Sequence, residues 1–248
     1  MKNTLIFTTC FLLFGNIYSQ TVNSGNVRPI RVFFNSGGGV GPNFMYTGIV
    51  TNKGDDVTIN TSGGVRPEIG MSYTIKNKID LGASLLFQTT SIYPTISNGT
   101  GSFDRSFLNI SGRYFIYLGK RQAQHINVGA SLPILFRSQM LFDFSQIPTR
   151  DLEEYNYKKT FGFSILGEYE IETKKRHWSW GAGLEYIFTS YKIDNIRING
   201  EEKPLDYWGN SSYDLYDFKG NSLNFYLRMS YRFGKLRSEK EQNSKAEK

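Results

Sequence analysis

Two runs of alternating residues, joined by a short basic turn, restrict the fold of this chain more than any other feature of its sequence. In residues 161–172 the odd positions hold mostly aromatic and aliphatic side chains, and the even positions hold mostly small or acidic ones. Residues 178–188 repeat the alternation, with the apolar side chains at even positions. A period of two is the pattern of a β-strand with two unlike faces. The segment is therefore predicted to be a hairpin with one apolar face.

Both runs are long enough to cross a lipid bilayer as tilted strands, which takes roughly 9–11 residues. The apolar face carries Phe161 and Phe188 at one end of the hairpin and Trp178 and Trp180 at the other. Aromatic residues at both ends of an apolar strand face are typical of membrane-spanning barrels. A composition with 15% aromatic residues and 25 glycines also favours strands over packed helices. These features predict a transmembrane β-barrel.

The N-terminal residues have the form of a secretory signal peptide. A continuous apolar run over residues 5–14 follows a short basic start. Cleavage is predicted between Ser19 and Gln20, which leaves a flexible segment over residues 20–26. The single cysteine of the chain, Cys10, lies within the signal. The mature chain is therefore expected to gain no stability from disulfide bonds.

The alternation recurs often enough along the chain to predict eight strands. The connections between them are alternately long and short, with the longest loops at residues 139–158 and 192–221. A glycine cluster at residues 37–39 interrupts the first strand and predicts a bulge or a sharp bend there. The expected strands are 28–46, 67–75, 79–88, 108–118, 126–137, 161–172, 178–189 and 224–233. The pattern predicts an all-β, eight-stranded antiparallel transmembrane barrel over residues 27–234, with short periplasmic turns and long extracellular loops.

This organisation resembles the small OmpA-like and PorT-like outer-membrane barrels of Gram-negative bacteria over nearly the whole mature chain. The strand from Phe225 to Phe233 is similar to the aromatic-ended last strand of that family. The resemblance implies a location in the outer membrane and recognition of this strand by the outer-membrane insertion machinery. Residues 235–248 form a charged tail, expected in the periplasm, that is too short for a peptidoglycan-binding domain.

Charged residues are predicted on the inner face of the barrel. An eight-stranded barrel has a bore only just wide enough for side chains to fill. Acidic and basic groups in so narrow a space are expected to pair, because an unpaired buried charge costs several kcal/mol. The expected result is a closed interior, and the alternative is a narrow pore for small solutes. The residues of this predicted charge network are Glu68, Arg113, Arg137, Glu168, Glu170, Glu185, Arg228 and Arg232.

The last long loop is the predicted interaction surface, because it gathers aromatic and acidic residues in a short span. Tyr and Trp bury large areas at low entropic cost, as a sugar or protein contact requires. The alternative is an aromatic belt at the membrane surface. The residues concerned are Asp206, Tyr207, Trp208, Tyr213, Asp214, Tyr216 and Asp217.

The expected partners are outer-membrane lipid, lipopolysaccharide and a surface ligand or envelope protein. The net charge of +7 forms no stripe typical of nucleic-acid binding, and no nucleic-acid partner is predicted.

Catalytic chemistry is not predicted. The two histidines, His125 and His177, both lie at the short turns, where neither could act as a base on a lipid of the outer leaflet. No cluster of His and Cys with metal-ligand spacing is present, and no cofactor is expected. A soluble lipocalin-like barrel is disfavoured because the inner face would carry charges. The sequence thus favours a structural or surface-binding barrel, followed by a narrow pore and then by a lipid-modifying enzyme.

Overall fold

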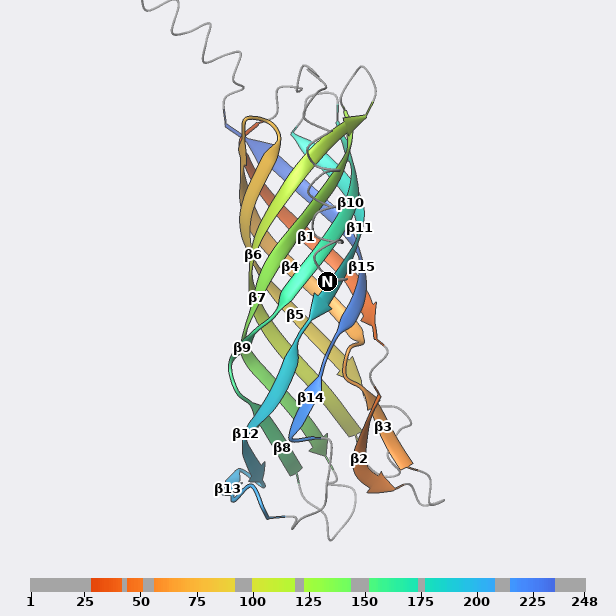
Figure 1. Ribbon diagram of the computed structural model, residues 1–248, viewed down its shortest axis with the longest axis vertical. Coiled ribbons are helices and arrows are strands. Elements are labelled where there is room, and N and C mark those ends of the chain that lie inside the picture. The colour runs from red at the N-terminus through yellow and green to blue at the C-terminus, as the bar shows by residue number, and fades with distance from the viewer. Residues whose placement is uncertain are drawn as a thin grey trace, which may run out of the picture.

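A computed structural model describes residues 28–41, 44–50, 56–91, 100–118, 123–143, 152–173, 177–207 and 215–234 of the chain. The predicted signal peptide, the segment over residues 20–26 and the tail over residues 235–248 lie outside these ranges. Within them, every regular element is a β-strand (Figure 1), and no helix long and apolar enough to cross a membrane is found.

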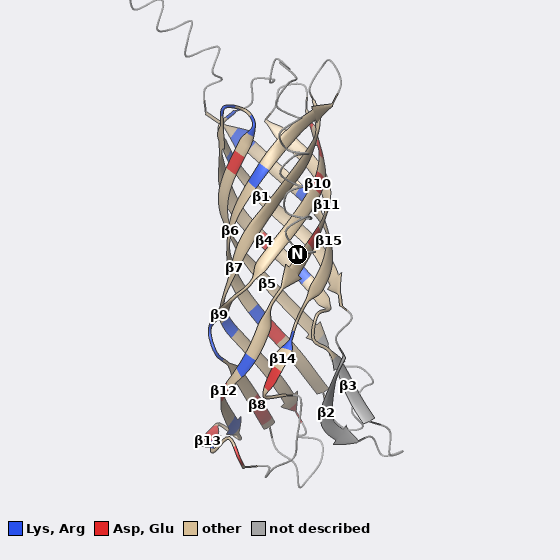
Figure 2. Cartoon of the chain, in the orientation of Figure 1, with Lys and Arg blue, Asp and Glu red and all other residues tan. Residues whose placement is uncertain are grey.

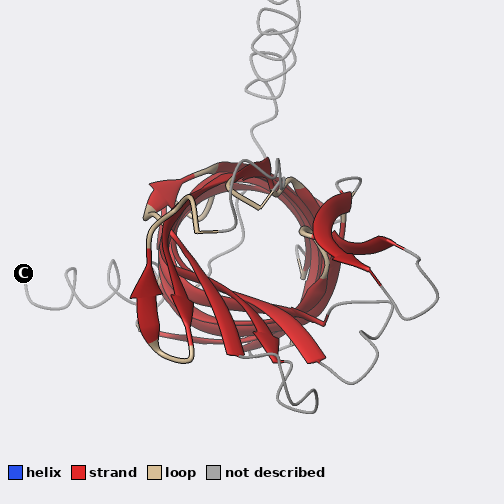
Figure 3. Cartoon of the chain, turned by 90° about the horizontal axis from the view of Figure 1, so that it is seen from below, coloured by secondary structure: helices blue, strands red, loops and turns tan. Residues whose placement is uncertain are grey.

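Eight of the strands close into an antiparallel barrel. Each barrel strand pairs with the next one along the chain, and pairing of the first strand, β1, with the last, β15, completes the ring. Figure 3 shows the ring viewed along the barrel axis. The predicted fold class is therefore confirmed. The barrel strands are β1 (Ile30–Val40), β4 (Gly64–Ile75), β5 (Ile79–Ser91), β6 (Thr100–Leu118), β7 (Gln124–Asp143), β10 (Phe163–Glu172), β11 (Trp178–Phe188) and β15 (Ser222–Phe233).

Four further strands prolong the wall of the barrel at one end. β8 (Leu152–Tyr157) and β9 (Thr160–Phe161) pair with β7 in the same register as β10, so the three form one interrupted strand. In the same way β12 (Ser190–Ile198) continues β11 and pairs with β8. β14 (Asp217–Lys219) precedes β15 and pairs with β12. We call this end, at the bottom of Figure 1, the long-loop end, and the opposite end, which carries the β4–β5 turn, the short-turn end.

This prolongation corrects the predicted loop boundaries. Much of the loops expected at residues 139–158 and 192–221 is paired strand, including β13 (Glu201–Lys203), which pairs with β12. The first loop also contains a separate hairpin, formed by β2 (Phe44–Val50) and β3 (Asp56–Asn60). Residues 44–46, assigned from the sequence to the first barrel strand, belong to that hairpin.

Side chains of opposite character face the two sides of the barrel wall. Along β15, Leu227 is 58% exposed on the outer surface, whereas its neighbour Arg228 is 1% exposed and lies inside. Trp180, beside Leu227 on the outer surface, is 59% exposed. Charged residues inside and large apolar residues outside are the reverse of a soluble protein and are typical of a barrel surrounded by lipid.

Local sequence explains the turns and interruptions of the wall. The β4–β5 turn places Lys76 and Asn77 at φ angles of 50° and 57°, as a tight hairpin turn requires. Pro133 lies opposite Gly162, at the gap between β9 and β10, because proline has no amide hydrogen to donate across the pair.

The glycine cluster of the first strand does not form the predicted bulge. β1 keeps one register against both neighbours. At Gly37 the reason for glycine is close approach, since a Cβ there would overlap the carbonyl oxygen of Phe225.

Candidate functional site: the charged lumen and the long-loop end

The inside of the barrel, here called the lumen, is filled by ion pairs arranged in successive layers. Nearest the short-turn end, Arg31 pairs with Asp80, and its Nη1 lies 3.0 Å from Glu170 Oε2. Arg232 lies between two carboxylates, with Nη2 3.6 Å from Glu170 Oε1 and Nε 3.4 Å from Glu172 Oε1. All five side chains are buried, and they come from β1, β5, β10 and β15. This layer joins four strands across the bore.

Glu168 is the centre of the middle layer. Its Oε2 lies 3.1 Å from Arg228 Nη1 and 3.5 Å from Arg113 Nη1, and it accepts a hydrogen bond of 2.9 Å from the Tyr226 hydroxyl. The Arg228 guanidinium also lies 4.3 Å from the centre of the Phe33 ring. Glu168 thus lies between two guanidiniums, and the Arg228 guanidinium also contacts an aromatic ring. These contacts compensate for the loss of water around all three charges.

The third layer lies toward the long-loop end. Arg66 pairs with Glu185 and has its Nη2 3.6 Å from Glu68 Oε2. Serine hydroxyls donate hydrogen bonds to both carboxylates. Ser164 donates to Glu185 over 2.6 Å, and Ser84 donates to Glu68 over 2.5 Å. Hydrogen bonding of the remaining carboxylate oxygens is what makes a buried ion pair tolerable.

Asn35 connects the middle and third layers. Its amide donates to Glu68 Oε2 over 2.6 Å, and its carbonyl accepts from Arg228 Nε over 2.7 Å. The Asn127 amide likewise donates to Glu168 Oε1 and to Glu170 Oε2 over 2.9 Å, which joins the first layer to the middle one. The three layers therefore form one hydrogen-bonded network.

Seven of the eight residues predicted for the charge network lie in the lumen, and one assignment is wrong. Arg137 is exposed on the outer surface, where its Nη2 donates to Gln139 Oε1 over 3.3 Å. The cause is a register shift between Ser106 and Phe107, which leaves Phe136 without a partner and reverses the inside and outside of the following residues. The seven that face inward are Glu68, Arg113, Glu168, Glu170, Glu185, Arg228 and Arg232.

The lumen also holds charged residues that were not predicted as part of the network: Arg31, Arg66, Asp80 and Glu172. Arg66 immediately precedes the strand start assigned from the sequence, and Arg31 lies in the strand whose limits the glycines obscured. In both places the arginine lies two residues before an inward residue, and so on the same face: Arg66 before Glu68, and Arg31 before Phe33. Extending the period of two would have found both arginines.

His125 is a lumen residue and not, as expected, a residue of the surface turn. Its ring is fully buried, with Nε2 3.2 Å from Glu170 Oε2. His125, Glu170 and Glu172 bring ligand atoms within 4.8 Å of one another, which is the size of a metal site. However, Arg31 and Arg232 already contact these carboxylates, and two guanidiniums disfavour a divalent cation beside them. We assign the group to the ion-pair network. The second histidine, His177, stacks on Tyr231 at the short-turn end.

Aromatic and aliphatic side chains replace the charges at the long-loop end of the interior. The Phe103 ring lies 5.2 Å from Tyr191 and 5.8 Å from Tyr157 and Phe218, in edge-to-face contacts. Their cluster, which we call the aromatic core, is buried. It comprises Leu86, Phe103, Phe107, Leu135, Met140, Phe142, Tyr155, Tyr157, Ile187, Tyr191, Ile193, Ile196, Ile198, Leu215 and Phe218.

Arg105 marks the boundary between the charged lumen and the aromatic core. Its guanidinium donates to the carbonyl oxygens of Thr61 and Gly63 over 2.6 and 2.7 Å and lies 4.6 Å from the Phe103 ring centre. Beyond this boundary, in β8, burial and the nearby Glu153 carboxylate raise the pKa of the Tyr155 phenol, and burial raises the pKa of Tyr157. Both phenols are neutral parts of the aromatic core.

The residues of the predicted interaction loop differ in their surroundings. Asp206, Tyr207 and Asp217 are exposed. Tyr216 packs against the aromatic core and donates a hydrogen bond of 3.0 Å to the Leu205 carbonyl oxygen, so it has a structural role. The other three residues, Trp208, Tyr213 and Asp214, lie outside the described residues.

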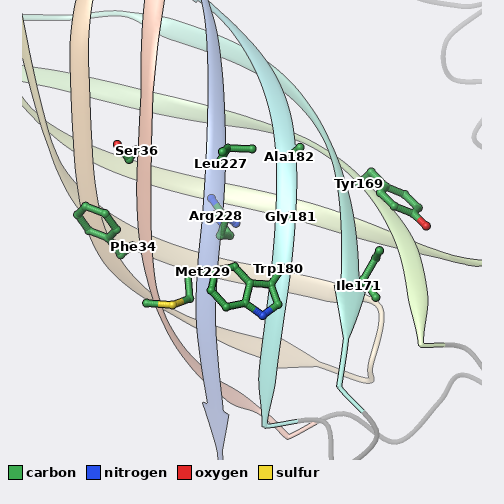
Figure 4. A pocket seen from close by; sticks show the side chains of 10 residues that line it. All are labelled: Phe34, Ser36, Tyr169, Ile171, Trp180, Gly181, Ala182, Leu227, Arg228 and Met229. Carbon is green, nitrogen blue, oxygen red and sulfur yellow. The ribbon is translucent and has the colours of Figure 1, made fainter.

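A pocket of about 490 Å³ lies on the outer surface, over β1, β15, β11 and β10 (Figure 4). Trp180, Met229, Phe34 and Leu227 line it, and all four side chains belong to the exposed apolar surface. Small residues such as Ala182 between these large ones produce the depression. The pocket therefore belongs to the face that meets lipid and offers no polar chemistry.

The comparisons with known proteins find the same architecture at a distance. No protein-family model matches the sequence, and no curated protein matches it either. Among solved structures, the chain is similar to the Neisserial surface protein A, with 11% identity, a TM-score of 0.49, and 84% of this chain and 99% of that chain covered.

Two further solved structures are similar at comparable distances. The attachment invasion locus protein Ail of Yersinia pestis, solved with the heparin analogue sucrose octasulfate, has 10% identity and a TM-score of 0.46, covering 84% and 99% of the two chains. The outer membrane protein AlkL, solved in lipid bilayers, has 12% identity and a TM-score of 0.43, covering 87% and 95%. We infer nothing about function from likenesses this distant.

Proposed function

We propose that the protein is an outer-membrane β-barrel with a structural or surface-binding role, whose interior is closed to solutes. The observation that carries this proposal is the chain of contacts across the bore. Each layer of the lumen joins a guanidinium to a carboxylate on another strand, and the aromatic core follows the last layer. A bore filled in this way leaves no continuous path for ions.

Conductance in planar bilayers tests the closed interior. Wild-type barrels should be silent, and Glu185→Ala, which removes the partner of Arg66, should give at most rare and brief openings because the other two layers and the aromatic core remain. The matched control is Arg137→Ala, which removes a charge from the outer surface and should leave the barrel silent. Frequent and stable openings of the wild-type barrel would show that the charges line a narrow pore instead.

We propose that the long-loop end faces the outside of the cell and the short-turn end faces the periplasm. This orientation follows the signal peptide expected at the N-terminus and the usual arrangement of outer-membrane barrels. A protease added to intact cells should cut within residues 139–158 or 192–221, outside the paired strands, and should spare the turn over residues 173–177. Cleavage only after the outer membrane has been permeabilised would contradict the orientation.

Surface binding is assigned to the long-loop end, where Asp206, Tyr207 and Asp217 are exposed. The proposed partners are outer-membrane lipid with lipopolysaccharide, and a surface ligand or envelope protein. The strand from Phe225 to Phe233 is the proposed contact for the insertion machinery. Replacing Trp208 and Tyr213 with Ser should weaken surface binding without loss of assembly, whereas loss of assembly would show a structural role.

A further inference from the structure

A row of basic side chains follows the aromatic residues at the long-loop end of the outer surface. Arg137 is on β7, Lys158 and Lys159 lie between β8 and β9, and Lys192 is on β12. All four are exposed. Figure 2 shows the corresponding blue segments near the labels β9 and β12. We call these four residues the basic row.

The pairing of the strands places the members of the basic row side by side. The register pairs Gln139 with Asn156 and Leu135 with Thr160, so Arg137 on β7 lies opposite Lys158. On the other side, the backbone amide of Lys158 donates to the carbonyl oxygen of Lys192 over 2.8 Å. Neighbouring strands are about 4.8 Å apart, so the row spans about 10 Å across three strands.

The row lies directly beyond the apolar surface. Phe136 precedes Arg137, Phe161 is two residues after Lys159, and Phe188, at the end of β11, is four residues before Lys192. All three aromatic side chains are exposed. Phe161 is the most exposed of these, at 73%. Aromatic residues of this kind mark the boundary between hydrocarbon and headgroups. The basic row is therefore at the depth of the lipid headgroups.

Two exposed carboxylates lie farther from the aromatic residues than the basic row does. Asp104 pairs in register with Gln139, two residues beyond Arg137, and Asp194 is two residues beyond Lys192. A third carboxylate, Asp217, lies opposite Lys192 at the level of the row, but no ion pair joins the two. Within the described ranges, the four cations of the row have no salt-bridge partner.

We propose that the basic row binds the headgroup of a glycolipid that carries more than one phosphate. Four cations on strands that span about 10 Å match the several negative charges of two phosphates on one sugar headgroup better than the single charge of one phosphodiester. Lys and Arg at headgroup depth bind anionic lipid by direct charge attraction, worth about one order of magnitude in affinity for every one to two residues. This inference rests on the proposed placement of the long-loop end in the outer leaflet and names the lipid partner of that end.

The test compares two matched double variants of the full-length barrel. Lys158→Gln/Lys159→Gln removes two cations of the basic row, and Lys76→Gln/Lys78→Gln removes two from the β4–β5 turn at the short-turn end. All variants should insert into bilayers, because these side chains lie outside the lumen. Binding is measured by native mass spectrometry with bisphosphorylated lipid A, with phosphatidylglycerol and with free pyrophosphate.

The wild type should retain lipid A in preference to phosphatidylglycerol, and Lys158→Gln/Lys159→Gln should weaken that binding about 30-fold. Lys76→Gln/Lys78→Gln should change it less than about twofold. Equal loss in both variants, or equal affinity for phosphatidylglycerol, would overturn the proposal. Binding of pyrophosphate as tight as that of lipid A would also overturn it, because the site would then bind phosphate without lipid. A barrel that inserts into no bilayer would instead contradict the proposed function.

Discussion

β11 and β12 form one continuous strand, yet their inner and outer faces have opposite chemistry. Along β11, Trp180 and Leu184 face outward, and Ser179 and Glu185 face inward. Along β12, the outward residues are polar, as at Lys192, and the inward residues are apolar, as the aromatic core shows. The pattern inverts within a few residues of Phe188. Since the backbone is the same, the difference reflects what surrounds the wall, which is lipid around β11 and water around β12.

The inversion also determines how each part of the interior is filled. Around β11 the outer face is apolar, and the inner face is polar because the strand alternates. Charges buried there need partners, and ion pairs fill the interior. Around β12 the outer face is polar, so the inner face can be apolar and pack as the core of a soluble protein does. Ion pairs thus fill one part of the interior, and apolar side chains fill the other.

The largest expected effect comes from breaking an ion pair in the lumen. Arg66→Ala should lower the free energy of unfolding by about 3–5 kcal/mol, because it leaves Glu185 and Glu68 buried without their shared cation. Denaturant unfolding of the lipid-embedded barrel measures this change. Arg137→Ala, at an exposed arginine, should cost less than about 0.5 kcal/mol. A cost below about 1 kcal/mol for Arg66→Ala would mean that water reaches the layer.

A double substitution sharpens the comparison of the two kinds of closure. If the ion pairs only fill space in the bore, apolar side chains of similar size should replace them without a large loss of stability, as is often found for buried ion pairs. Arg66→Met combined with Glu185→Met should therefore recover about 2 kcal/mol relative to the sum of the single substitutions. Additive losses would show that the two residues do not act as a pair.

The sequence predicted the membrane-spanning part well, because there a single rule holds. The rule is that charged residues face inward and apolar residues face outward. It was sufficient to predict all eight barrel strands and the lumen position of residues such as Glu168 and Arg228. Beyond the membrane the rule inverts. Residues 190–198 also alternate, apart from an irregularity between Ile193 and Asn195, but residues 192–198 were interpreted as part of a loop because their outward residues are polar. A search for alternation regardless of which face is apolar would have extended these strands.

One of two further errors had a cause that alternation cannot reveal. The register shift at Phe136 adds one residue to β7 opposite β6, and it moved Arg137 to the outer surface. This shift depends on contacts between strands, which a single sequence does not display. His125 is a different case. It lies two residues before the inward Asn127, so extending the alternation would have placed it in the lumen, where its ring is buried beside Glu170 and Phe115.

A smaller effect is expected in the aromatic core. Phe103→Leu should cost about 1–2 kcal/mol, because it removes the ring that contacts Tyr157, Tyr191 and Phe218 and leaves space that leucine only partly fills. The variant should remain silent in conductance measurements, since the ion pairs of the lumen still close the bore. The control Phe161→Leu, at a residue 73% exposed to the surroundings, should change the stability less. Channel openings in Phe103→Leu would show that the aromatic core, not the lumen, closes the barrel.

The smallest effect is a dependence on alkaline pH confined to the aromatic core. Because burial raises the pKa of Tyr157 in the folded barrel, its neutral phenol stabilises the fold fully below the ordinary tyrosine value of about 10. Above that value the unfolded chain releases the proton while the folded barrel keeps it, so this stabilisation is lost as the pH rises. At pH 10.5 the loss for one such tyrosine is about 0.8 kcal/mol. Tyr157→Phe should therefore flatten the decline of unfolding free energy between pH 9 and pH 10.5 by about that amount. An unchanged slope would mean that the phenol ionises in the folded barrel and that water enters the aromatic core.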